Sequence, residues 1–141
     1  MSAPTPKATP RPRGEEQRWF DAAADGRLVY WRCDACGHIP SYPRAQCPEC
    51  WSTDLRELES AGQGEIYSFT VQYRPGATGF ADEVPYAVAL VTMTEGYRVL
   101  AGVATDQPER IRVGDAVTVV FDGVAGDVDT LPRFRLAEES P

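Results

Sequence analysis

Hydrophobic and polar residues alternate along the second half of the chain with the period of two that half-buried β-strands require. In residues 62–75 the alternation puts Tyr67, Phe69 and Tyr73 on one predicted face and Ile66 on the other. Further strand-like segments are residues 85–93, 97–104, 111–121 and 131–137. The pattern therefore predicts five short strands.

The turns between these segments indicate how the strands are arranged. Glu95 and Gly96 separate the second and third segments as in a hairpin, because glycine supplies the backbone angles of a tight turn. A longer break follows the third strand. Five short strands with glycine-rich turns favour a small barrel, which closes on itself and leaves no exposed sheet edge. We therefore expect a mainly β fold with an OB-fold barrel.

The first half of the chain lacks this alternation. Residues 1–13 contain four prolines and almost no apolar side chains, which predicts a disordered tail or a linker from a larger polypeptide. Residues 14–25 favour a helix with Trp19, Phe20 and Ala23 on its apolar side. Because a helix this short needs a docking surface, we expect it to pack against the rest of the chain or against a partner.

All four cysteines lie in one stretch, as Cys33, Cys36, Cys47 and Cys50. Each C-x2-C can form a knuckle that points both sulfurs at one ion, and the ten-residue spacer can bring the knuckles opposite each other. Four thiolates at about 2.3 Å surround Zn²⁺ tetrahedrally and leave no open position for a substrate. The spacing predicts one structural Zn²⁺ per chain, with iron in a rubredoxin-like site as the alternative.

Other uses of these residues fit the sequence less well. Two disulfides would require an oxidising compartment, and a redox C-x2-C expects a βαβ unit that the pattern lacks. His38, the only histidine, is expected to be a surface turn residue. Without a second histidine or a spare cysteine, nucleophile–base pairs are hard to assemble, so we assign no catalytic residue. The predicted units are a tail or linker (1–13), an N-terminal helix (14–27), a rubredoxin-like zinc ribbon (28–60), the OB-fold (61–137) and a tail (138–141).

The net charge of −7 is unevenly distributed. Residues 1–50 carry a net +1, whereas residues 51–141, which contain the predicted barrel, carry −8. Nucleic-acid binding depends on a cationic surface that releases counterions, so the acidic barrel disfavours it. No apolar run approaches the roughly 20 residues that cross a bilayer, and the N-terminus has no apolar signal-peptide core. We expect a cytoplasmic protein without membrane contact.

Several of these segments, taken together, resemble a known family from about Arg18 to Phe134. In order they are RLVYWRCDACG, YPRAQCPEC, GQGEIYSFTV, PYAVALV, IRVGDAVTVVF and LPRFR. They are similar to the zinc-ribbon plus OB-fold proteins called domain-of-unknown-function family thirty-five, which are associated with acyl-CoA. The family's four zinc-binding cysteines match Cys33, Cys36, Cys47 and Cys50.

The resemblance implies a non-catalytic partner subunit of a thiolase-like enzyme. Family members accompany aldolases, lyases or acyltransferases that act on acyl-CoA, including the steroid side-chain retro-aldolases of actinobacteria. In the steroid case a similar domain is fused to, or accompanies, a MaoC-type hydratase subunit. The resemblance thus implies a hetero-oligomer in which acyl-CoA is bound mainly through the partner.

Two hypotheses for the function remain. The first is this scaffold or channelling subunit, and the second is a nucleic-acid-binding module that stacks bases on the aromatic face of residues 62–75. For the first, we expect partner contacts from aromatic and apolar side chains of the helix, the cysteine spacer and a long loop: Trp19, Phe20, Ile39, Tyr42, Pro43 and Phe80. That loop, residues 74–85, either lines a partner's substrate tunnel or is a mobile surface loop.

Overall fold

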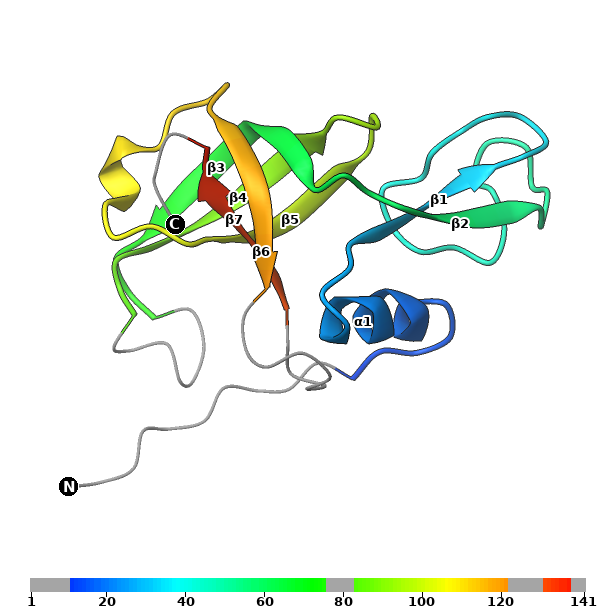
Figure 1. Ribbon diagram of the computed structural model, residues 1–141, viewed down its shortest axis with the longest axis horizontal. Coiled ribbons are helices and arrows are strands. Elements are labelled where there is room, and N and C mark those ends of the chain that lie inside the picture. Colours follow the sequence, from blue (N-terminus) through cyan, green and yellow to red (C-terminus); the bar gives the residue numbers. More distant parts are fainter. Residues whose placement is uncertain (1–10, 76–82, 122–130, 138–141) are drawn as a thin grey trace.

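A computed structural model describes residues 11–75, 83–121 and 131–137 of the chain (Figure 1). Helix α1 (Glu16–Ala24) precedes a two-stranded antiparallel sheet of β1 (Val29–Cys33) and β2 (Leu55–Glu59). The elements that follow are β3 (Gln63–Gln72), β4 (Tyr86–Met93), β5 (Arg98–Val103), the 3-10 helix η1 (Pro108–Arg110), β6 (Ala116–Phe121) and β7 (Pro132–Leu136). Strands β3, β4, β5, β7 and β6 close into a barrel in that order. The predicted mainly β fold with an OB-fold barrel is confirmed.

Strand β4 shows most clearly why these residues form a barrel. Its alternate residues Ala87, Ala89, Val91 and Met93 are buried, and the residues between them are half-buried on the outer face. It pairs antiparallel with β3 and β5, and the barrel closes through a parallel contact between β5 and β7. Phe134 of β7 is fully buried in the core, where a side chain of this size contributes about 2–3 kcal/mol.

A β-bulge in β3 changes the predicted alternation. The pairing of β3 with β4 shifts register between Ile66 and Ser68, which leaves Tyr67 as the extra residue. An extra residue moves every following side chain to the opposite face. Ile66 and Phe69 therefore both pack against the core, whereas Tyr67 is exposed. The prediction that Tyr67 and Phe69 share one face was wrong for this reason.

The β1–β2 unit, which we call the ribbon, shares a core with the barrel. Leu28, just before β1, lies in the barrel's hydrophobic cluster. The ring of Tyr30 stacks on Tyr97 with 4.9 Å between centroids. Glu95, in the β4–β5 turn, accepts a 2.9 Å hydrogen bond from the hydroxyl of Ser60 and a 2.8 Å hydrogen bond from the next backbone amide. These contacts hold the ribbon in a defined orientation.

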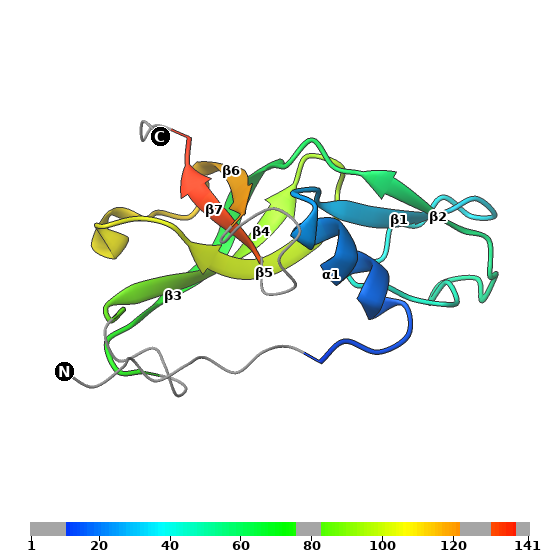
Figure 2. The same cartoon turned by 60° about the horizontal axis from the view of Figure 1, so that its bottom comes forward.

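Helix α1 lies beside this junction, as Figures 1 and 2 show from two directions. Its residues Ala22, Ala23 and Ala24 are buried. Trp19 packs against both the barrel core and a second, smaller cluster of Ala22, Val29 and Trp31. The helix is thus held by packing within the chain, one of the two alternatives that the sequence left open. In the described part of the chain, no helix has the length and apolar character needed to span a membrane.

Candidate metal centre and contact groove

The two cysteine knuckles have the same backbone hydrogen bonds. In the first, the carbonyl of Cys33 accepts from the amide of Gly37 at 2.8 Å. In the second, the carbonyl of Cys47 accepts from the amide of Trp51 at 2.9 Å. The amides of Cys33 and Cys47 are also matched, since each donates at 2.8 Å to the carbonyl five residues later. Each C-x2-C therefore folds into the same turn, as the spacing predicted.

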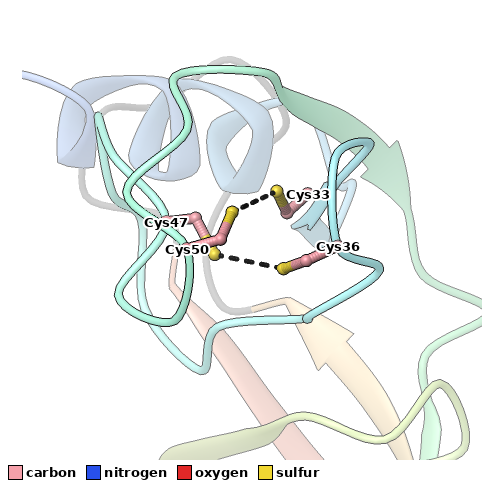
Figure 3. A group of neighbouring side chains, drawn as sticks. All are labelled: Cys33, Cys36, Cys47 and Cys50. Carbon is pink, nitrogen blue, oxygen red and sulfur yellow. Dashed lines mark hydrogen bonds between the residues drawn. The ribbon is translucent and has the colours of Figure 1, made fainter.

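The knuckles face each other and direct the four sulfurs to one centre (Figure 3). The Sγ atoms of Cys33 and Cys50 are 3.5 Å apart, and those of Cys36 and Cys47 are 3.7 Å apart. All four lie within 4.8 Å of one another, and none forms a disulfide. A tetrahedron with metal–sulfur bonds of about 2.3 Å has sulfur–sulfur edges of about 3.8 Å. The donor set and its spacing therefore fit a tetrahedral metal ion such as Zn²⁺.

The ionisation of the thiols also fits a cation at this centre. Burial raises the pKa of Cys47, but hydrogen bonds from the amides of Cys50 and Glu49 and from neighbouring thiols lower it to about 7. The amide of His38 lowers the pKa of Cys36, but desolvation and the other three sulfurs raise it to about 12. Four thiolates this close repel one another, so the cluster ionises fully only around a cation.

The four cysteines differ in burial. Cys33, at the end of β1, and Cys47 are fully buried, whereas Cys36 and Cys50 are exposed. His38 contributes its backbone carbonyl to the first knuckle, and among the described residues the only metal-ligating cluster is the four cysteines. A site with four protein sulfurs leaves no position for a substrate, so the ion that fits here is structural.

Four of the six predicted contact residues line one apolar groove of about 250 Å³. Trp19 and Phe20 come from α1, and Tyr42 and Pro43 come from the spacer between the cysteine pairs. Leu100 of β5, which no sequence motif indicated, completes the apolar wall and is 58% exposed. The groove thus lies where the helix, the ribbon and the barrel meet.

The other two predicted contact residues are not part of this groove. Ile39 is half-buried against the barrel core. Phe80 and most of the loop 74–85 lie outside the described residues. The one sequence signal for Leu100 is the alternation along β5. Because Val99 is buried, the next residue, Leu100, points to the outer face and is exposed.

The aromatic residues of the nucleic-acid hypothesis are not presented together. Tyr67 and Tyr73 are exposed, but Phe69 is half-buried against the core. The guanidinium of Arg98 lies 3.8 Å from the centre of the Tyr67 ring, which covers one stacking face. This outer surface therefore lacks the row of free aromatic faces on which successive bases stack.

Comparisons with known proteins match both parts of the chain. Residues 20–56 match the family model described as the rubredoxin-like zinc ribbon domain of ChsH2. Residues 57–122 match the model described as the C-terminal OB-fold domain of ChsH2. The boundary between the two matches falls within β2.

Several curated proteins and a solved structure are similar to the chain. A probable enoyl-CoA hydratase alpha subunit of Thermomonospora curvata is 42% identical over 94% of the chain, which spans only 41% of that protein. A DUF35 domain-containing scaffold protein of Methanothermobacter thermautotrophicus is 38% identical over 64% of the chain and 68% of that protein. The benzoylsuccinyl-CoA thiolase subunit BbsA of Thauera aromatica is 28% identical over 82% of the chain and 83% of that protein. A chain of the Ltp2-ChsH2(DUF35) aldolase structure is 38% identical, with a TM-score of 0.81 over 91% of this chain and 98% of that one.

Proposed function

Because the chain belongs to the DUF35 family of ChsH2-type zinc-ribbon and OB-fold proteins, we propose that it is a non-catalytic partner subunit of a thiolase-like enzyme. It binds an aldolase, lyase or acyltransferase that acts on acyl-CoA, and it stabilises the active complex. The partner carries the catalytic residues and makes most of the contacts to the acyl-CoA. The subunit has no activity alone.

The observation that carries this proposal is the apolar groove. Trp19 and Phe20 are far in sequence from Tyr42 and Pro43, yet all four side chains line it together with the exposed Leu100. Aromatic and apolar side chains that gather around a recess are typical of the energetically important centre of a protein interface. Four of the six residues proposed from the sequence as partner contacts line this one recess, which supports the proposal.

The names of the relatives support the choice of partner. One similar protein is named as a thiolase subunit, another as a scaffold protein, and the similar solved structure is named as an aldolase. The chain also matches part of a longer hydratase alpha subunit. We therefore propose a thiolase-like partner, with steroid side-chain acyl-CoA as one candidate substrate and a MaoC-type hydratase as a further subunit. The loop 74–85 is a candidate contact to the partner's substrate tunnel.

The metal stabilises the surface that the partner binds. We propose that Cys33, Cys36, Cys47 and Cys50 hold one Zn²⁺, which adds folding free energy to a ribbon whose own buried cluster is small. The spacer between the cysteine pairs carries Tyr42 and Pro43, so the ion fixes one wall of the groove. Its role is structural, and the chemistry belongs to the partner.

The proposal is tested by co-purifying the tagged full-length chain with a thiolase-like protein identified by mass spectrometry. The dissociation constant of the purified pair is then measured for Leu100→Glu, with Val113→Glu as the control. Leu100 is 58% exposed in the groove and Val113 is 67% exposed elsewhere, so both changes add one charge to an exposed site. Leu100→Glu is expected to weaken binding at least about tenfold, because it places a charge in an apolar interface, and Val113→Glu to leave it unchanged.

Two results would contradict the proposal. One is tight binding of single-stranded DNA or RNA at physiological salt by a chain that binds no thiolase-like protein. The other is turnover of an acyl-CoA substrate by the purified chain alone.

A further inference from the structure

Trp51 follows the last cysteine of the cluster and has two unusual properties. Its side chain is 75% exposed, although tryptophan is usually well covered in folded proteins. Its φ angle is +65°, and among the described residues it is the only non-glycine residue in this left-handed region. Both properties oppose stability, so the folded chain does not explain why tryptophan stands at this position.

The first knuckle shows what the position requires. Gly37 occupies the equivalent place, donates the equivalent hydrogen bond and has a φ of +82°. Glycine adopts this conformation without a steric cost, whereas a residue with a β-carbon does not. The backbone of Trp51 is nevertheless held there, because its amide donates to Cys47 and its carbonyl accepts a 2.7 Å hydrogen bond from the side chain of Gln46.

The pseudo-symmetric knuckles thus provide an internal comparison. The turn needs a left-handed residue, glycine meets that need at one site, and tryptophan replaces it at the other. Backbone strain of this kind is concentrated at functional sites, where another requirement outweighs the local cost. A large indole that is presented to solvent on a metal-fixed turn meets the requirements for contact with another molecule.

The charge around the indole indicates the chemistry of the contact. Residues 33–54 contain three carboxylates and one guanidinium: Asp34, Glu49, Asp54 and Arg44. Asp34 is paired with the guanidinium of Arg56 at 3.0 Å, whereas Glu49 and Asp54 lie within three residues of Trp51. Four thiolates around one Zn²⁺ add two further negative charges. The knuckles are therefore acidic around an exposed aromatic face, which is the combination that attracts a lysine or arginine side chain.

We propose that Trp51 is a second docking point for the thiolase-like partner, separate from the apolar groove, and that a lysine or arginine side chain of the partner packs on the indole. This inference rests on the proposed function, and it adds a contact that the groove does not include, because Trp51 does not line it. The partner then contacts both the junction with the barrel and the metal-bearing end of the ribbon.

The test separates the indole from the backbone by comparing Trp51→Gly with Trp51→Ala in the zinc-loaded, full-length chain. Both variants remove the ring, but only glycine relieves the left-handed strain. The dissociation constant for the purified thiolase-like partner is expected to rise at least about tenfold in both variants. It should rise less in Trp51→Phe, which keeps an aromatic face. It should stay unchanged in the control Val113→Ala. Zinc content is expected to stay at one per chain, and Trp51→Gly is expected to melt at a higher temperature than Trp51→Ala.

Specific outcomes overturn the inference while leaving the proposed function intact. Partner affinities of Trp51→Gly and Trp51→Ala within threefold of the unaltered chain would show that the indole is not a docking residue. A lower zinc content or melting temperature of Trp51→Gly than of the unaltered chain would assign Trp51 to the fold instead. If the free chain sediments as a dimer and Trp51→Ala makes it monomeric, the occupant is a second copy. Failure of the unaltered chain to bind any thiolase-like protein would overturn both proposals.

Discussion

Glu95 joins the ribbon to the barrel, and its replacement tests whether this junction is stabilised as the structure indicates. One carboxylate oxygen accepts from the hydroxyl of Ser60 at 2.9 Å and the other from the amide of Ala61 at 2.8 Å. A hydrogen bond to a charged group contributes about 1.5–3 kcal/mol when buried, and about 1 kcal/mol is reasonable for each of these half-exposed bonds. Glu95→Ala should therefore lower the free energy of unfolding by about 2 kcal/mol.

The measurement is urea unfolding of the zinc-loaded chain, with Glu109→Ala as the control. Glu109 lies exposed in η1, so its replacement removes the same charge without disturbing the junction. A double-mutant cycle with Ser60→Ala should give a coupling energy of about 1 kcal/mol between Ser60 and Glu95. Two results would refute the reasoning and leave apolar packing as the main junction contact. One is that the two replacements lower the free energy of unfolding additively; the other is that Glu95→Ala changes this free energy by less than about 0.5 kcal/mol.

Three further predictions follow from the core and the metal centre. Removal of zinc by a chelator, or by Cys33→Ser, should lower the melting temperature of the barrel as well as that of the ribbon. The two are linked because Leu28, just before β1 of the ribbon, packs in the barrel core. A barrel whose melting temperature in a calorimetric scan does not change would contradict this. Burial raises the pKa of Tyr97, so above about pH 10 the unfolded chain loses a proton that the folded chain keeps. As the pH rises above about 10, the free energy of unfolding should therefore fall more steeply in the unaltered chain than in Tyr97→Phe, by up to about 1.4 kcal/mol per pH unit. If urea unfolding gives the two proteins parallel pH profiles, burial does not raise the pKa of Tyr97. Gly64→Ala would place a β-carbon 2.5 Å from the backbone oxygen of Thr92 and should destabilise the chain by about 1–3 kcal/mol in urea unfolding. Gly102→Ala is the control, because its β-carbon would meet no atom closer than 3.4 Å.

Local chemistry made much of the fold predictable. The C-x2-C pairs specify their own turns, and the structure forms the same hydrogen bonds in both. The alternation along β4 is unbroken, so its buried residues follow directly from the pattern. The prediction failed at Tyr67 because one extra residue in a bulge reverses the alternation, and a bulge depends on pairing with β4 that the sequence of β3 alone does not contain.

The candidate contact surface was only partly predictable, for a related reason. The aromatic residues of the helix and of the spacer could be proposed separately, because each is unusual in its own segment. That Trp19, Tyr42 and Leu100 line one groove depends on how the ribbon packs against the barrel. The same packing draws Ile39 toward the core, although the sequence pattern grouped it with the exposed residues.

The sequence by itself therefore determined what nearby residues decide: the metal-ligand set, the turn at each knuckle, and the strands that build the barrel. Only the tertiary structure decided which side chains remain available to a partner, because exposure depends on contacts between segments that are distant along the chain. Trp51 illustrates both the part that the sequence determines and the part that only the tertiary structure decides. The sequence places tryptophan where the first knuckle has glycine, and only the folded chain shows that its backbone is left-handed and its indole exposed.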